Sequence, residues 1–310
     1  MEMITIKNKK IVVTGGLGFI GSHIAERLHR DNQVIVVDNE STGKIENIEH
    51  LDNQVDVVLA DINEADLEEI FDGCDYVLHQ AALPSVPRSI KDPLKSNNAN
   101  ITGTLKVLLA ARDSGVKKVV LASSSSVYGD TPTLPKVETM PINPKSPYAV
   151  TKATGELYAQ NFQDIYHLQV TCLRYFNVFG PRQDPNSQYA AVIPKFITAI
   201  MQGQQPTVYG DGKQSRDFTY VNNVVDANIL ACQSPESGVY NIACGRRIIL
   251  NDLLDMINDL LGTDIQAKYV DSRPGDIKHS LADIKKAETM GYQPPDNFRE
   301  ELEKTIAFFR

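Results

Sequence analysis

The sequence contains a tyrosine and a lysine whose spacing suits proton transfer, Tyr148 and Lys152 in the string SPYAVTK. Residues 146–166 have a helical pattern, and residues four apart in a helix share one face. A phenol with a pKa of about 10 is a poor base at neutral pH, but a nearby ammonium favours the phenolate and lowers that pKa. Tyr148 is therefore a candidate general base for an alcohol or sugar hydroxyl. A second pair at this spacing, Tyr209 and Lys213 in YGDGK, lies in a glycine-rich segment where we expect no helix.

Four consecutive serines, Ser123 to Ser126, follow the apolar run KKVVLA. Serine runs are usually solvated loops, but open α/β sheets bind ligands at the carboxyl ends of their strands. A serine hydroxyl at this place can hydrogen-bond a reacting oxygen and share its proton with Tyr148. The serine run and the Tyr-Lys pair together indicate a proton-transfer site at the edge of a parallel sheet.

A glycine motif predicts a dinucleotide site earlier in the chain. In TGGLGFIGSH, Gly15, Gly18 and Gly21 follow a predicted strand and open a helix. Glycines there let the backbone approach a pyrophosphate, and the helix N-terminus supplies N–H donors. Asp38 ends the next strand about 20 residues beyond Gly18, where a carboxylate accepts hydrogen bonds from the adenosine ribose and repels a 2′-phosphate. Asn39 follows it rather than an arginine, so the sequence favours NAD over NADP as the cofactor.

Further residues of the cofactor site are expected at the ends of neighbouring strands. Asp61 and Ile62 follow the third predicted strand, near the adenine, and Ala81 and Ala82 follow the fourth and let the chain pass close to the cofactor. Each of these is equally compatible with an ordinary strand end. The full expected set is Gly15, Gly18, Phe19, Ile20, Gly21, Asp38, Asn39, Ser41, Gly43, Asp61, Ile62, Ala81, Ala82, Tyr148 and Lys152. The positive nicotinamide ring, like the lysine ammonium, would favour the tyrosine phenolate.

A parallel sheet is expected to position these motifs, because apolar strand patterns alternate with helical ones over the first 180 residues. The strands are expected at 9–15, 33–38, 55–61, 75–81, 117–125 and 168–180, and the longer helices at 18–30, 94–114 and 146–166. This alternation predicts an α/β fold, a Rossmann-type doubly wound parallel sheet covered on both faces. After a turn-rich break at 181–188, shorter strands alternate with helices at 190–203, 221–233, 249–261 and 297–309. We expect an NAD-binding Rossmann domain at 1–180 and a smaller C-terminal α/β substrate region at 181–310.

Composition limits the remaining classes of protein. The 310 residues are 42% hydrophobic and carry a net charge of −8, which suits a globular chain and disfavours nucleic acid or an anionic membrane surface as partner. The four cysteines form no C-x-x-C pair and have no histidine at ligand spacing, so we expect no metal site and a reducing compartment. No stretch approaches the length of a membrane span, and the N-terminus has no apolar signal core. The expected location is the cytoplasm.

These motifs, together with several longer strings, resemble the extended short-chain dehydrogenase/reductase family and, within it, the nucleotide-sugar 4-epimerases. The strings are VYGD (127–130), RYFNVFGPRQDP (174–185), AAVIPKF (190–196), GDGKQSRDFTYVNNV (210–224) and RPGD (273–276). The resemblance implies a tightly held NAD that is oxidant and then reductant in one turnover, with Ser124, Tyr148 and Lys152 as the catalytic residues. It also implies UDP-sugar contacts from Ser85, Arg88, Ser124, Ser125, Asn177, Ala191, Val192, Arg216, Arg273 and Ser280. The two arginines at 216 and 273 would clamp the diphosphate.

Departures from the family pattern narrow the activity that the resemblance implies. Related dehydratases carry Asp-Glu after the catalytic serine or threonine, whereas Ser125 and Ser126 stand here, so we expect no dehydration. Ser280 resembles the subgroup that accepts N-acetylated hexosamines, because the tyrosine of glucose-only members would fill the space that an acetamido group needs. The expected reaction is 4-epimerisation of UDP-GlcNAc/UDP-GalNAc and of UDP-glucose/UDP-galactose. Asn100 departs from the family spacing, and its role as a contact stays open.

Three alternatives remain open on the sequence. One is a UDP-glucuronate 4-epimerase, in which Arg88 could bind the C6 carboxylate. Another is a net oxidoreductase that releases a keto-sugar and accumulates NADH, and the third is a non-catalytic NAD-binding regulatory protein. The helices at 94–114 and 146–166 carry apolar residues on more than one face, and such helices often pack against a second copy, so we expect a homodimer.

Overall fold

The computed structural model describes residues 4–51, 54–185, 191–272 and 278–310. Its centre is a seven-stranded sheet in the order β11-β6-β5-β4-β1-β2-β3, and all neighbouring strands run parallel. The strands are β1 (Lys10–Thr14), β2 (Gln33–Asp38), β3 (Asp56–Leu59), β4 (Tyr76–His79), β5 (Lys118–Ser124), β6 (Gln169–Tyr175) and β11 (Gly238–Ile242). The predicted Rossmann-type sheet is confirmed.

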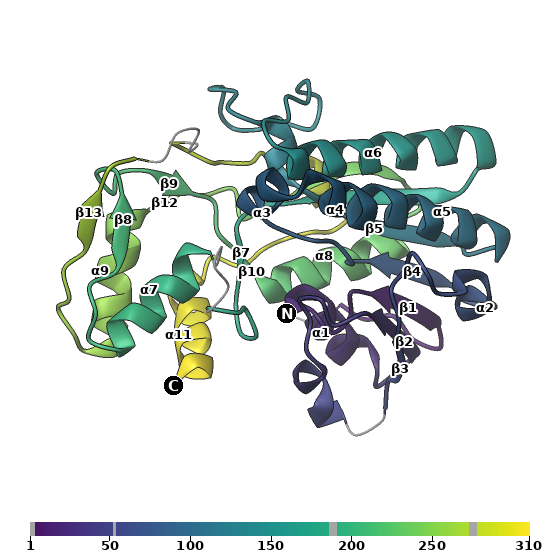
Figure 1. Ribbon diagram of the computed structural model, residues 1–310, viewed down its shortest axis with the longest axis horizontal. Coiled ribbons are helices and arrows are strands. Elements are labelled where there is room, and N and C mark those ends of the chain that lie inside the picture. The colour runs from purple at the N-terminus through teal and green to yellow at the C-terminus, as the bar shows by residue number, and fades with distance from the viewer. Residues whose placement is uncertain (1–3, 52–53, 186–190, 273–277) are drawn as a thin grey trace.

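Helices cover both faces of this sheet, as Figure 1 shows. One face carries α1 (Phe19–Leu28) and α8 (Val221–Gln233), and the other carries α2 (Leu67–Phe71), α5 (Gly103–Asp113) and α6 (Pro147–Tyr166). Side chains of a strand point alternately to the two faces, so Ile11 and Val13 join the first apolar core and Val12 joins the second. Both cores need apolar residues, which is why the strands have continuous apolar sequences.

The segment predicted as one helix at 94–114 has three parts. A π-helical turn at Asn98–Thr102 separates α4 (Pro93–Asn97) from α5, and α3 (Val86–Lys91) precedes both. Asp92 starts α4 because its side chain accepts the N–H of Lys95 at 2.9 Å, and a proline stands at the first helical position. π-helical turns are rare and occur frequently at functional sites. This one turns Asn100 into the interior, where it is 3% exposed.

The C-terminal region packs around its own apolar cluster, on the left of Figure 1. Its helices are α7 (Val192–Met201), α9 (Leu250–Leu261) and α11 (Phe298–Phe309), whereas α10 (Lys285–Glu288) packs against β11 at the edge of the main sheet. Its short strands are β7 (Val178–Phe179), β8 (Thr207–Tyr209), β9 (Ser215–Arg216), β10 (Thr219–Tyr220), β12 (Ile248–Ile249) and β13 (Lys268–Val270). The four helices predicted after residue 180 are confirmed as α7, α8, α9 and α11. The strand predicted at 168–180 divides into β6 and β7, because Asn177 has a φ of 36° and interrupts the extended chain.

The chain crosses between the sheet and the C-terminal region more than once. α8 and β11 lie after residue 180 in the sequence, yet α8 packs on the sheet and β11 extends it beside β6. The division between 1–180 and 181–310 stays a prediction, and the sheet itself is completed by residues of the later segment. Among the described residues, no helix is long and apolar enough to cross a membrane.

Candidate active site

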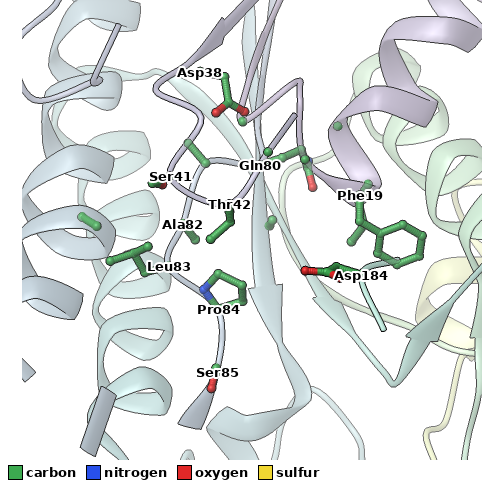
Figure 2. A pocket seen from close by; sticks show the side chains of 18 of the residues that line it. Phe19, Asp38, Ser41, Thr42, Gln80, Ala82, Leu83, Pro84, Ser85 and Asp184 are labelled. Atoms are coloured by element: carbon green, nitrogen blue, oxygen red, sulfur yellow. The ribbon is translucent and has the colours of Figure 1, made fainter. Parts of the chain in front are cut away.

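A large cavity opens along the carboxyl ends of β1, β2, β4 and β5. Its volume of about 1290 Å³ exceeds the ~300–1,000 Å³ typical of pockets for one small ligand, so it has room for two ligands side by side. Every residue expected to bind the cofactor lines this cavity. Figure 2 shows part of the lining, with Ser41 and Leu83 on one side and Phe19 and Asp184 on the other.

The glycine turn before and at the start of α1 is packed so closely that Gly15 and Gly21 have no room for side chains. Gly15 has a φ of +69°, and a Cβ there would lie 2.6 Å from the backbone nitrogen of Ala81, in the loop after β4. A Cβ on Gly21 would lie 2.2 Å from the carbonyl oxygen of Gly15. Gly18 is the N-cap residue of α1 and caps it with no side chain, so the helix presents its first N–H groups toward the cavity. This turn therefore has the space and the donors that a pyrophosphate requires.

Asp38 ends β2 and fits the ribose of a dinucleotide. The N–H groups of Leu17 and Glu40 donate to its two carboxylate oxygens at 3.0 and 2.8 Å, and each oxygen keeps a further lone pair for a hydroxyl. Burial raises the pKa of Asp38, and these two N–H groups oppose the rise. Beside it, the Asn39 amide donates to the Asp61 carboxylate at 2.8 Å and ties the loop after β2 to the loop after β3.

Tyr148, Lys152 and Ser124 meet at the inner end of the cavity. The side chains of Tyr148 and Ser124 are hydrogen-bonded to each other. The Lys152 Nζ donates to the carbonyl oxygen of Ala122 at 2.8 Å and lies 6.0 Å from the centre of the Tyr148 ring. The predicted shared face on one helix is confirmed, since both residues belong to α6. Tyr209 and Lys213 share no helix, as expected, because Tyr209 ends β8 and residues 210–213 are not helical.

Burial changes the protonation of this pair in a way that the sequence did not predict. It raises the pKa of the Tyr148 phenol, and the hydrogen bond with Ser124 only partly opposes the rise. Burial also lowers the pKa of Lys152 from 10.5 to about 8. Protein side chains alone therefore do not produce the expected lowering of the phenol pKa, because desolvation outweighs them. A nicotinamide bound beside Tyr148 would bring positive charge that favours the phenolate.

Asn100, whose role the sequence left open, joins the catalytic helix to the loop after β4. Its amide oxygen accepts the N–H of Leu83 at 2.7 Å, and its amide nitrogen donates to the Leu83 carbonyl at 3.2 Å. The same nitrogen donates to the hydroxyl of Thr151 at 3.0 Å, and that hydroxyl donates to the carbonyl oxygen of Tyr148 at 2.7 Å. Asn100 thus fixes the backbone that carries the cavity lining.

A buried ion pair lies behind the catalytic residues. Arg174 of β6 donates to the two carboxylate oxygens of Glu156 at 2.9 and 2.7 Å, and the hydroxyl of Ser123 donates to the same carboxylate at 2.5 Å. Glu156 lies one turn beyond Lys152 on α6, and Ser123 precedes Ser124 on β5. The pair therefore connects the strand end and the helix on which the proton-transfer groups lie.

The expected substrate contacts divide into three groups. Those that line the cavity are Ser85, Arg88, Ser124, Ser125, Asn177 and Ala191. Val192, Arg216 and Ser280 are described but do not line it: the first begins α7, the second lies on β9, and the third is hydrogen-bonded through its N–H to Ser215 beside Arg216. Arg273 lies outside the described residues. Contact of these residues with a ligand stays a prediction.

Several cavity residues were missed in the sequence. Phe308 and Phe309 end α11, and only the tertiary fold brings this helix end to the cavity. Arg182 also lines the cavity, where its guanidinium pairs with Glu26 of α1. Its position directly after a predicted strand was a usable signal, because residues at strand ends face the ligand in open α/β sheets.

The fold and the site geometry define a dinucleotide-binding enzyme that transfers a proton beside its cofactor. Two features carry this class: a glycine turn with an aspartate at the end of the next strand, and a partly buried tyrosine beside a serine and a lysine. The chain belongs to the NAD dependent epimerase/dehydratase family, whose sequence profile matches residues 11–243. Membership of this family confirms NAD as the predicted cofactor.

The chain is similar over nearly its whole length to proteins of named activity. The UDP-glucose 4-epimerase of Mycolicibacterium smegmatis is 37% identical over 309 residues, which cover 97% of this chain and 98% of that protein. The solved UDP-N-acetylglucosamine 4-epimerase from Methanobrevibacter ruminantium M1, in complex with UDP-N-acetylmuramic acid, is 50% identical with a TM-score of 0.97, covering 98% of this chain and 99% of that one. The UDP-glucose 4-epimerase of Thermotoga maritima, solved with UDP-glucose, is 37% identical with a TM-score of 0.93, covering 97% and 98%.

Proposed function

We propose that the protein is an NAD-dependent UDP-sugar 4-epimerase, an isomerase that oxidises C4 of the sugar transiently and returns the hydride to the opposite face. The observation that carries this proposal is the Ser124–Tyr148 hydrogen bond beside Lys152 in a cavity large enough for a dinucleotide and a nucleotide-sugar. The similarity to 4-epimerases over nearly the full chain supports it.

The chain's own residues supply the proton chemistry. The glycine turn and Asp38 would hold NAD, which would supply a reversible hydride acceptor beside the substrate. Tyr148 takes the proton from the sugar 4-hydroxyl and later returns it, while Ser124 holds the same oxygen by a hydrogen bond. Lys152, held by the carbonyl oxygen of Ala122, places an ammonium near the phenol ring. The small neutral side chains of Ser85 and Ser125 leave the 4-keto sugar free to turn over between the two hydride transfers.

The proposed substrates are UDP-GlcNAc/UDP-GalNAc together with UDP-glucose/UDP-galactose. The small side chain of Ser280 supports the acetylated pair, as does the 50% identity to a UDP-N-acetylglucosamine 4-epimerase. Arg216 and Arg273 are proposed to clamp the diphosphate. Inversion at C4 requires that UDP is bound tightly and that the hexose is bound loosely enough to rotate.

The test incubates purified protein with each UDP-hexose, without added NAD, and separates the C4 epimers. We expect epimers to form and Tyr148→Phe to lose several orders of magnitude in kcat while still binding UDP. Tyr158→Phe, on the same helix but outside the cavity lining, is the matched control and should keep wild-type turnover. Accumulating NADH would instead indicate a net oxidoreductase, and turnover of UDP-glucuronate alone would indicate the uronate epimerase. NAD binding with no turnover of any UDP-sugar would indicate a regulatory protein.

We further propose that the protein is a cytoplasmic homodimer. The helices α3, α4 and α6 lie side by side (Figure 1) and expose Ile90, Leu94 and Leu157 by 63%, 82% and 62%. Exposed apolar side chains on neighbouring helices favour a partner, here a second copy. Leu94→Asp with Leu157→Asp should give monomers by sedimentation, whereas Leu59→Asp, 62% exposed on the edge strand β3, should leave the mass unchanged. A monomeric wild-type protein would refute the dimer.

A further inference from the structure

The carboxylate of Asp217 joins separate chain segments beside the cavity. Asp217 lies between β9 and β10 and is 0% exposed. Its Oδ1 accepts the N–H of Cys244 at 2.9 Å, and its Oδ2 accepts the N–H groups of Gly245 and Ala282, each at 3.1 Å. Within the described ranges of the chain, no salt bridge reaches this carboxylate, so backbone N–H groups alone stabilise it.

The segments that meet at Asp217 carry residues expected to contact the nucleotide-sugar. Arg216 directly precedes it on β9. Asn177, which lines the cavity, donates from its side-chain amide to the carbonyl oxygen of Asp217 at 3.0 Å. The N–H of Ser280 donates to the carbonyl oxygen of Ser215 at 3.0 Å, and Ala282 follows two residues later. The Asp217 carboxylate thus fixes the segments at 244–245 and 282, and the Asp217 backbone lies next to Arg216 and is bonded to Asn177.

The chemistry of this junction requires a carboxylate. A buried charge is unfavourable unless hydrogen bonds compensate it, and here the backbone N–H groups of residues 244, 245 and 282 point at its two oxygens. Burial raises the pKa of Asp217 to about 6, and these N–H groups oppose the rise. An amide would offer only one acceptor oxygen, and its NH₂ group would face an N–H donor on the other side. Asparagine therefore cannot hold both sides of the junction.

We propose that Asp217 is a positioning residue that holds Asn177, Arg216 and Ser280 in one wall of the nucleotide-sugar site. This inference rests on the proposed function, because it takes these three residues to be substrate contacts. The catalytic groups lie on β5 and α6, outside the joined segments. Asp217 therefore acts on UDP-sugar binding and leaves the proton and hydride steps unchanged.

The test compares Asp217→Asn with wild type by epimerase kinetics and by calorimetric titration with UDP. We expect KM for the UDP-sugar and Kd for UDP to rise by about tenfold, as for the loss of a hydrogen bond to a charged group, with kcat within twofold and NAD content unchanged. Asp226→Asn is the matched control. Asp226 pairs with Arg27 at 2.7 Å between α8 and α1, so this variant should lower stability without changing KM or Kd.

A merely structural role would give a different result. Partial unfolding lowers the titration stoichiometry and kcat per total protein, but it leaves KM and Kd of the folded fraction at wild-type values. That result for Asp217→Asn would overturn the inference. If the variant does not fold, Asp217→Glu is tested instead, which keeps both acceptor oxygens but moves them by one methylene relative to the N–H groups of Cys244, Gly245 and Ala282. A several-fold rise in Kd supports the proposal, and an unchanged Kd overturns it.

The outcomes also separate this inference from the proposed function. An active wild-type enzyme whose variants bind UDP normally overturns only the role of Asp217. A wild-type protein that binds UDP but epimerises no UDP-sugar overturns the proposed reaction, and the UDP titrations still decide the role of Asp217. A wild-type protein that does not bind UDP overturns both.

Discussion

Gly15→Ala should lower both the free energy of unfolding and the affinity for NAD, whereas a glycine substitution in an ordinary turn lowers only the first. Gly15 has a φ of +69°, a left-handed conformation that costs an alanine about 1 kcal/mol. Its new Cβ would also lie 2.6 Å from the nitrogen and 2.7 Å from the Cα of Ala81. These are backbone atoms, so the loop after β4 must move, at a further cost of about 1–3 kcal/mol. That loop lines the cofactor side of the cavity.

Gly115→Ala separates the two contributions. Gly115 has nearly the same φ, +66°, but a Cβ there would meet nothing within 4 Å. It should therefore lose only the conformational part, about 1 kcal/mol in the free energy of unfolding, and bind NAD normally. Gly15→Ala should lose about 2–4 kcal/mol and also weaken NAD binding.

The assay is urea denaturation of both variants, with calorimetric titration of NAD into protein stripped of cofactor. The difference between the two variants measures the contact with Ala81 directly. Equal stability losses in the two variants, with NAD affinity at position 15 within twofold of wild type, would refute the role of the glycine turn as a backbone cradle.

Three further predictions concern buried polar groups. Glu156→Gln should lower the free energy of unfolding by about 3 kcal/mol in urea denaturation, because the buried Arg174 guanidinium loses its counter-charge; a loss below about 1 kcal/mol would contradict this. Burial raises the pKa of Glu301 from 4.5 to about 7, so the folded protein keeps a proton that the unfolded chain releases, and stability falls as pH rises across that interval. Glu301→Gln should flatten this fall and gain up to about 3 kcal/mol at pH 8 but little at pH 5, measured by urea denaturation at both pH values. Asn100→Ala should cost about 2–4 kcal/mol by leaving the Leu83 N–H and carbonyl unpaired, and an unchanged unfolding midpoint would exclude that role.

The parts of the site that could be predicted from the sequence are those built by local geometry. Tyr148 and Lys152 share a face because four residues nearly complete one helical turn. Gly15 and Asp38 end consecutive parallel strands, and β1 pairs with β2 in register, so their side of the cavity follows from strand order alone. Each of these two arrangements can be predicted from the helix period or from the position of a residue at the end of a strand.

The remaining features depend on contacts between distant segments. The string GVYNIA (238–243), which forms β11, predicts a strand, but nothing in it specifies pairing with β6 at the edge of the main sheet. The break at Asn177 is a single backbone conformation within an apolar run. The sequence predicts that the lysine and the nicotinamide ring together lower the pKa of Tyr148, but it does not show the burial that raises this pKa in the chain without cofactor. Burial is a property of the whole fold, and here it exceeds the effect of one hydrogen bond.

The backbone is packed tightly at the glycine turn on the cofactor side of the cavity, which suits the proposed reaction, in which the cofactor stays bound and the sugar turns. On the cofactor side, Gly15 and Gly21 leave no room even for a methyl group against backbone atoms, so the cradle can hold a dinucleotide in one position. Outside the cavity lining, β9 and β10 are two residues long, and the Asp217 carboxylate between them accepts the N–H groups of Cys244, Gly245 and Ala282. Under the proposed function, β9 and β10, fixed at Asp217, would bind the UDP part of the substrate, and few residues would contact the hexose. In the proposed reaction, this tight packing at the glycine turn would favour retention of NAD while the keto-sugar rotates.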